Sequence, residues 1–248
     1  MTKKYHMEAM DLLHMVQVEP GSLGKYALVP GPIERVGAII KRLNDPVKDF
    51  SFQGIEMYTG ELGETLVTAV NSGMYAPPGA IVAEMLAAGG TQNIIRTGSC
   101  GAMREDINIG DLIIVSSCIR GEGTTSYYVP ENFSTVADFI LTQALIDACE
   151  ELGHTYYIGS VWSTDALLRE SKEMIAEICE LQAVGIDMIT SSILTVAQIK
   201  GVKGAGVLAV SDNLITGELG FVSPKFYEAE TQTIDVAVRA IEILESNE

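Results

Sequence analysis

Two arginines of this chain lie where an anion-binding site needs them. Arg96 ends a short apolar run and is followed three residues later by Ser99, and Arg35 lies in the first turn of a predicted helix that follows Gly31. Guanidinium and hydroxyl groups bind phosphate oxygens, and backbone N–H groups at a helix N-terminus add partial positive charge. The pattern therefore predicts a phosphate site made by these four residues. The spacing fits a structural role equally well, with Arg35 solvated on its helix and Arg96 in a buried ion pair.

One carboxylate, Asp212, is a candidate for the chemistry itself. It follows the apolar run 206–210, and ligands of α/β proteins bind beyond the carboxyl ends of such strands. The Ser-Asp-Asn composition around it is also typical of turns and helix caps. The local sequence leaves both roles open.

Other catalytic motifs are missing from the sequence. No Walker loop is present, and the glycine-rich stretch 121–126 does not lead into a helical pattern. The three histidines, His6, His14 and His154, lack metal-ligand spacing, and no nucleophile elbow accompanies them. We therefore predict neither a metal site nor Ser-His-Asp catalysis.

The elements that would position the candidate residues alternate along the chain. Short β-rich runs, several of them continuously apolar, are separated by stretches of helical period. This alternation predicts an α/β fold with a single domain over residues 1–248, in which a central mixed β-sheet is flanked by helices on both faces. The predicted strands span residues 26–30, 66–70, 93–96, 112–116, 156–160 and 206–210. The predicted helices span residues 33–43, 78–88, 136–152, 171–181, 190–199 and a C-terminal stretch around 234–244.

Composition excludes several classes of function. The chain has 248 residues, a formal net charge of −17 and a pI near 4.5, so we expect no binding to nucleic acid or to anionic membrane surfaces. No run approaches the ~20 apolar residues of a membrane span. The four cysteines are widely spaced and the start lacks the apolar region of a signal peptide. We therefore predict a cytoplasmic protein with reduced thiols.

Longer stretches of the sequence resemble the nucleoside phosphorylase superfamily, which holds the uridine phosphorylases and the hexameric purine nucleoside phosphorylases. Residues 94–115 are very similar to the central signature of the purine enzymes, and residues 209–212 resemble the purine type again. Residues 11–36 and 120–139 look like the uridine phosphorylase versions of their segments. The resemblance runs from about residue 11 to the C-terminus.

This resemblance implies phosphorolysis, in which inorganic phosphate attacks C1′ of a nucleoside to give ribose 1-phosphate and a free base. It implies that Gly31, Arg35, Arg96 and Ser99 hold the phosphate. It also implies that Asp212 protonates N7 of a purine leaving group, which favours the catalytic role of this residue over a capping role.

The resemblance further implies how the nucleoside is held. Met188 would pack on the ribose, and Leu167 stands where a stacking Phe is usual. His14 would reach the nucleoside bound by a neighbouring subunit, so a homo-oligomer built from dimers, usually a hexamer, is expected. Nucleoside and phosphate are the expected small-molecule partners, and neither a metal nor an organic cofactor is implied beyond phosphate as co-substrate.

Some positions depart from the family pattern. Ile189 stands where the family has a Glu that accepts hydrogen bonds from the ribose hydroxyls, and each such bond to a charged acceptor is worth ~1.5–3 kcal/mol. A third phosphate arginine expected within residues 49–60 is absent, with Gln53 near its place. Tyr75 stands where a small glycine is usual.

These departures leave three hypotheses. The preferred one is an active phosphorylase with a shifted sugar or base preference, acting on uridine or a purine nucleoside. The second is a nucleosidase that uses water, against which the phosphate-binding residues argue. The third is a catalytically weak or non-catalytic homologue that binds nucleoside and phosphate.

Overall fold

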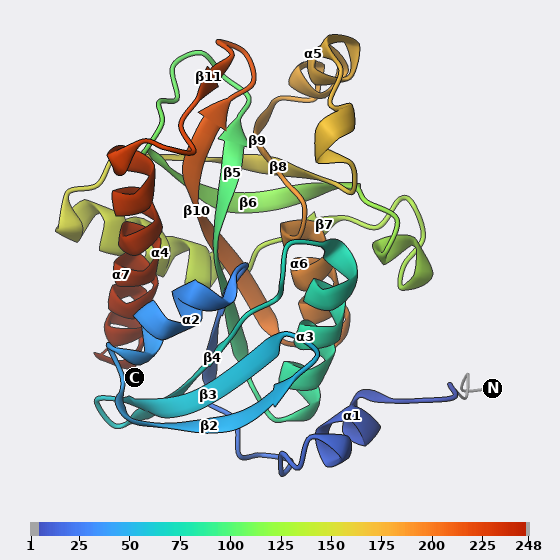
Figure 1. Ribbon diagram of the computed structural model, residues 1–248, viewed down its shortest axis with the longest axis vertical. Coiled ribbons are helices and arrows are strands. Elements are labelled where there is room, and N and C mark those ends of the chain that lie inside the picture. The colour runs from blue at the N-terminus through green and yellow to red at the C-terminus, as the bar shows by residue number, and fades with distance from the viewer. Residues whose placement is uncertain (1–4, 247–248) are drawn as a thin grey trace.

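The computed structural model describes residues 5–246, so residues 1–4 and 247–248 of the predicted domain lie outside the described residues. Eleven strands form one mixed sheet, and helices lie on both sides of it (Figure 1). The predicted α/β class and mixed sheet are confirmed.

The strands are β1 (Tyr26–Pro30), β2 (Asn44–Phe52), β3 (Ile55–Leu62), β4 (Thr65–Val70), β5 (Asn93–Ala102), β6 (Leu112–Gly121), β7 (Thr135–Val136), β8 (Tyr156–Thr164), β9 (Ala183–Asp187), β10 (Lys203–Asn213) and β11 (Glu218–Leu219). The helices are α1 (Ala9–Met15), α2 (Ile33–Ile40), α3 (Ala76–Ala88), α4 (Phe139–Leu152), α5 (Lys172–Glu180), α6 (Thr190–Ile199) and α7 (Pro224–Ser246), with 3-10 turns η1 (Thr125–Tyr127) and η2 (Leu167–Arg169).

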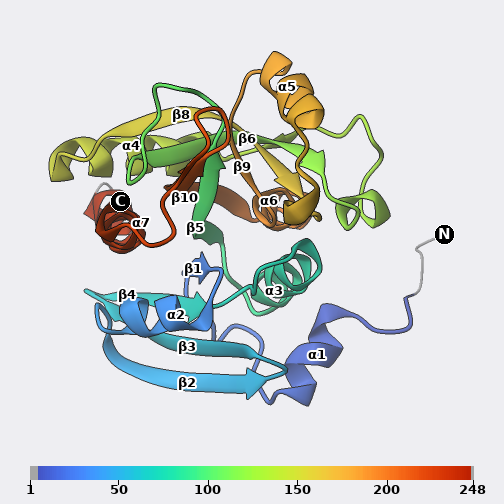
Figure 2. The same ribbon diagram turned by 45° about the horizontal axis from the view of Figure 1, so that its top comes forward.

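Part of the sheet closes on itself. β10 pairs in parallel with β5 and antiparallel with β6, and the pairings β6–β8, β8–β9 and β9–β5 complete a ring. From β5 the sheet continues through β1, β4 and β3 to β2, and Figure 2 shows β2–β4 at the opposite end of the molecule from β6 and β8. Because β1, β5 and β10 run parallel, their carboxyl ends meet at one edge.

Strand β1 shows how the core is divided between the two faces of the sheet. All five of its residues are buried. Tyr26 and Leu28 pack in a cluster with α2, α4 and α7, whereas Ala27 and Val29 pack in a second cluster with α1, α3 and α6. Figure 1 shows α4 and α7 on one side of β5 and β10, and α3 and α6 on the other. Burial on both faces explains why the run is continuously apolar.

The structure corrects the predicted ends of two site strands. The strand predicted over residues 93–96 continues to Ala102, because Gly98 pairs with β10 and Gly101 pairs with β9. The strand predicted over residues 206–210 likewise continues through Asp212 to Asn213. The polar residues that the sequence places after these strands therefore lie within them, where the backbone pairing fixes their positions.

The predicted start of the helix over residues 136–152 is also wrong. Val136 belongs to β7, where it pairs with Ser117 of β6. The helix α4 begins at Phe139, because the Asp138 side chain accepts a hydrogen bond from the Leu141 N–H at 3.0 Å and caps the first turn. No helix within residues 5–246 has the length and apolar character that a membrane span requires.

Candidate active site

A pocket of about 230 Å³ lies at the edge where β1, β5, β9 and β10 bring their functional residues together. His14 does not line it; this residue is exposed on α1. The other predicted site residues all line the pocket: Gly31, Arg35, Arg96, Ser99, Leu167, Met188 and Asp212.

Arg96 is buried at one end of this pocket, with 3 % of its surface exposed. Its Nη1 donates to the carbonyl oxygens of Val29 and Thr97, both at 3.1 Å, while its Nε has no partner among the described residues. A Cβ on Gly98 would lie 2.6 Å from Cζ of Arg96, so glycine leaves room for the guanidinium. Arg96 thus donates to backbone carbonyls and not to a carboxylate. The alternative role from the sequence, a buried ion pair, is therefore not what the structure has at this residue.

Arg35 is buried too, with 8 % exposed, and is not the solvated helix residue of the alternative interpretation. Its Nη2 donates to Ser99 Oγ at 3.4 Å and pairs with the carboxylate of Glu230 on α7. Its Nε and Nη1 have no partner within residues 5–246. Burial, together with the charge of Arg96, lowers the pKa of Arg35 to about 9. Two neighbouring buried guanidinium groups with unused N–H groups are suited to an anion such as phosphate.

Asp212 lies farther along the same pocket, next to a bulge in β10 between Val210 and Asp212. Ser211 Oγ donates to Asp212 Oδ1 at 2.6 Å. Burial raises the pKa of Asp212, and the Ser211 hydrogen bond partly offsets this. A carboxyl in such a place can hold a proton and give it to a base.

The turn that follows Asp212 is capped by its neighbour. Asn213 Oδ1 accepts hydrogen bonds from the N–H groups of Ile215 and Thr216 at 2.9 and 3.0 Å. The Ser-Asp-Asn composition therefore does mark a turn, but Asn213 supplies the cap and Asp212 faces the pocket.

The wall beside Met188 is apolar where a sugar would lie. Ile189 lines the pocket and is 3 % exposed, packed against Gly79 of α3. The neighbouring carboxylate of Asp187 is already engaged: Oδ1 accepts from Ser163 Oγ at 2.6 Å, and Oδ2 accepts from the Thr190 N–H at 2.9 Å. Asp187 thus caps the start of α6, and its carboxylate does not replace the Glu that accepts hydrogen bonds from the ribose hydroxyls at position 189 of the family pattern.

Three residues that the sequence analysis missed contribute to the site. Glu170 follows η2 and Phe221 lies in the segment before α7, and both line the pocket. Glu230 pairs with Arg35 from the second turn of α7. No motif in the sequence marks these three residues as parts of the site.

Two of the departing residues do not line the pocket. Tyr75 is the N-cap residue of α3 and is 55 % exposed, next to Met74 of the pocket wall. Gln53 occupies the turn between β2 and β3 with a φ of 53°. In this chain, neither residue completes the arginine pair.

A larger hollow of about 710 Å³ lies between β6, η1 and residues 131–136. Its guanidinium, that of Arg120, donates to the carbonyl oxygens of Pro130 and Glu131 and is therefore engaged. None of the predicted site residues lines this hollow. Among residues 5–246, no group of three or more His, Cys, Asp or Glu side chains is arranged to hold a metal ion.

Comparisons with known proteins identify relatives of this chain. Residues 25–243 match the family model described as the phosphorylase superfamily. The chain is 32 % identical to the uridine phosphorylase of Thermococcus kodakarensis over 243 residues, covering 92 % of this chain and 85 % of the relative. It is 26 % identical to the guanosine phosphorylase of Halorubrum lacusprofundi, with 81 % and 83 % covered, and 29 % identical to the DeoD-type purine nucleoside phosphorylase of Bacillus cereus, with 82 % and 88 % covered.

The fold is similar to that of a solved structure as well. A crystal structure of uridine phosphorylase from Vibrio fischeri, complexed with 6-hydroxy-1-naphthoic acid, superposes with a TM-score of 0.84 at 24 % identity, covering 92 % of this chain and 95 % of that one. The region matched by the family model contains both buried arginines and the acid at the far end of their pocket. With that match and a relative above 30 % identity over nearly the whole chain, this protein belongs to the phosphorylase superfamily.

Proposed function

We propose that this protein is a nucleoside phosphorylase, an enzyme that uses inorganic phosphate to cleave the N-glycosidic bond of a nucleoside. The observation that carries the proposal is one pocket with two buried, incompletely bonded guanidinium groups at one end and a carboxyl of raised pKa farther along. The relatives named uridine, guanosine and purine nucleoside phosphorylase support it. A nucleosidase, which uses water, has no need of the two arginines.

In the proposed reaction, phosphate binds at Arg35, Arg96, Ser99 and the N–H of Gly31, and one of its oxygens attacks C1′. The C1′–O bond forms as the C1′–N bond breaks, and the bonding electron pair leaves with the base. Asp212 then gives its proton to N7 of a purine, so that the base departs neutral and the sugar leaves as its 1-phosphate. The positioned guanidinium groups and the acid stabilise the charges that develop, which is the main source of catalysis in such sites. Phosphate is the co-substrate, and these steps call for no organic cofactor or metal.

The nucleoside is held by apolar contacts in this proposal. Met188 packs on the sugar and Leu167 on the base, both from the walls of the pocket. His14, exposed on α1, contributes to the site of a neighbouring subunit in a dimer, with three dimers making a hexamer. Light scattering tests the assembly, and a monomer with full activity would remove His14 from the site. Free cysteines at all four positions support a reducing, cytoplasmic setting.

A second candidate function, a weak or non-catalytic nucleoside-binding homologue, is favoured by one observation. Ile189 presents an apolar side chain on the sugar wall, and Asp187 beside it is engaged by Ser163 and Thr190. The ribose hydroxyls then lack a charged acceptor from this part of the chain.

Base release from inosine, adenosine, uridine, thymidine and methylthioadenosine, each with and without phosphate, tests the two candidates. Phosphate-dependent release supports the phosphorylase and identifies its base. Release without phosphate would indicate a nucleosidase. No release from any of the five would reject the proposed activity in favour of the binding homologue.

A further inference from the structure

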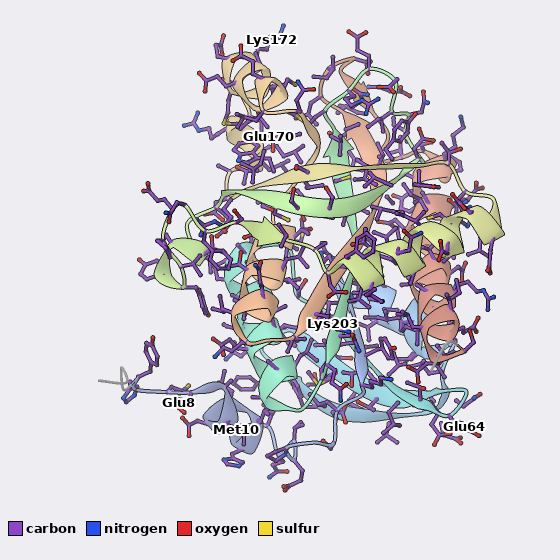
Figure 3. All side chains as sticks on the ribbon, turned by 180° about the vertical axis from the view of Figure 1, so that it is seen from behind. Glu8, Met10, Glu64, Glu170, Lys172 and Lys203 are labelled. Carbon is purple, nitrogen blue, oxygen red and sulfur yellow. The ribbon has the colours of Figure 1, made fainter. Side chains whose placement is uncertain are left out.

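A second carboxyl group shares the pocket with Asp212. Glu170 reaches it from the segment between η2 and α5, where Figure 3 labels it. Its side chain is half-buried, and its carboxylate makes no hydrogen bond or ion pair with any described residue. Asp212 Oδ1 is bonded to Ser211, while Oδ2 accepts no hydrogen bond from a described residue. Glycine at position 101 leaves room for the Leu214 side chain, whose Cδ1 would clash with a Cβ there. Two carboxyl groups with unused hydrogen-bonding capacity therefore face one cavity.

The surroundings of this pair are apolar. Ile186, Leu214 and Phe221 line the same pocket as the two acids. Such walls accept the faces of a flat heterocycle and leave its polar edge for the carboxyl groups. The low local dielectric also strengthens each hydrogen bond that the edge forms.

The shared cavity favours a proton on this pair of acids. Burial, and then the charge of Asp212, raises the pKa of Glu170 to about 7, and burial raises the pKa of Asp212 as well. The other charged groups lining the pocket are Arg35, Arg96 and Asp187; among these and Asp212, it is Asp212 whose charge acts on Glu170. Two negative charges in one desolvated cavity repel each other, so on the acid side of neutrality Glu170 holds a proton that it can exchange with Asp212 across the cavity.

We propose that Glu170 and Asp212 together recognise the base, one donating an O–H and the other accepting an N–H, so that the pocket selects a base edge with an acceptor beside a donor. This inference rests on the proposed function, in which the Asp212 end of the pocket holds the base. Adenine has such an edge in N7 and its 6-amino group. With N7 placed at Asp212, as in the proposed reaction, hypoxanthine presents two acceptors to the pair, N7 and O6, which one shared proton does not match; its N1–H donor lies on the far side of O6. Uracil also offers an acceptor beside a donor, in O4 and N3–H, so uridine is the other nucleoside whose base the pair would recognise.

The test compares Glu170→Gln with Glu177→Gln, a matched change at an exposed position of α5 outside the pocket. The measurement is kcat/KM for adenosine, inosine and uridine at saturating phosphate and pH 6.5. The wild type is expected to prefer adenosine or uridine to inosine by about ten- to hundredfold, the size of one hydrogen bond to a charged group. The adenosine and uridine arms show which of the two bases is used.

Glu170→Gln should bring the preference over inosine to within about threefold, because a neutral amide rotates to offer either a donor or an acceptor. Glu177→Gln should keep the wild-type preference. An unchanged preference in Glu170→Gln, or a wild type that prefers inosine to both other substrates, overturns the proposal. A wild type without phosphate-dependent release from any nucleoside would instead reject the proposed function, and calorimetric binding of adenine and hypoxanthine would then still test the pair.

A pH profile gives a second readout that a purely structural role would not move. The wild-type kcat/KM for adenosine should fall above about pH 7, where the pair loses its proton. In Glu170→Gln this alkaline limb should move to lower pH, because Asp212 then titrates without a negative neighbour. The ionisation of the phosphate substrate affects the pH profile of Glu177→Gln as it affects that of the wild type, so this variant serves as the reference. Coincident profiles for the two variants would contradict the shared proton.

Discussion

The buried guanidinium of Arg35 on α2 is paired with the carboxylate of Glu230 on α7, although the site already holds a second arginine. The carboxylate offsets the repulsion between Arg35 and Arg96 while the anion site is empty. It also engages Nη2 of a guanidinium that the proposed reaction needs for phosphate. Glu230 is therefore both a stabilising counter-ion and a competitor of the substrate.

Glu230→Gln should separate these two effects. In phosphate-free buffer the free energy of unfolding should fall by roughly 3 kcal/mol, because a largely buried arginine loses its counter-ion. Added phosphate should recover most of this loss, and the KM for phosphate should decrease. Urea unfolding with and without phosphate measures the first effect, and steady-state kinetics the second. Glu228→Gln, exposed on the same helix, is the control; equal stabilities of the two variants would show that the ion pair contributes nothing.

Asp212→Asn should remove the proton donor and keep the shape of the side chain. The kcat for a purine nucleoside should fall by about 10²–10⁴-fold. Ser211→Ala should act differently, because it removes the hydrogen bond that lowers the pKa of Asp212. In that variant the alkaline limb of the pH–rate profile should move to higher pH with kcat largely kept. If both variants lost activity to the same extent at every pH, proton donation by Asp212 would be ruled out.

Ile189→Glu should place a charged acceptor on the sugar wall of the pocket. Each hydrogen bond from a ribose hydroxyl to this carboxylate is worth about 1.5–3 kcal/mol, so the preference for ribonucleosides over 2′-deoxyribonucleosides should rise at least about tenfold. Stability should fall by about 2–4 kcal/mol, since position 189 is nearly fully buried. The ratio of kcat/KM for uridine and 2′-deoxyuridine, or for adenosine and 2′-deoxyadenosine, is the readout. Ile189→Leu should leave this ratio unchanged, and a folded Glu variant with the wild-type ratio would place the ribose hydroxyls elsewhere.

The raised pKa of Glu170 predicts how stability depends on pH. The pKa goes from an ordinary value of 4.5 to about 7 in the folded protein, so the folded state holds its proton more tightly than the unfolded state. Stability is therefore lost as the pH rises from about 4.5 to 7. Glu170→Gln should be more stable than the wild type at pH 8, by on the order of 1 kcal/mol after allowing for solvent screening, and equally stable below pH 4.5. Urea titrations at both pH values check this, and a Gln variant less stable at pH 8 would contradict the burial of the charge.

Local sequence determined much of the fold and the polar ends of the site. The continuous apolar runs predict β1, β4, the first halves of β5, β6 and β8, and the middle of β10, because buried strands need apolar residues on both faces. The two arginines, Ser99 and Asp212 were identifiable as candidates because they lie at the ends of apolar strands, where ligands of α/β proteins bind, although the local sequence fitted structural roles equally well. The family resemblance then supplied their expected roles, and the structure brings them into one pocket.

Tertiary structure alone decided which distant groups act on these residues. Glu230 pairs with Arg35 across the packing of α7 on α2, and Glu170 shares a pocket with Asp212 because the ring of strands brings the end of β8 near β10. Contacts between residues so far apart in the chain follow from strand order and helix packing, which no local pattern records. The pKa values of the site residues and the pairing of their buried charges depend on these contacts, because burial and neighbouring charges act through space rather than along the sequence.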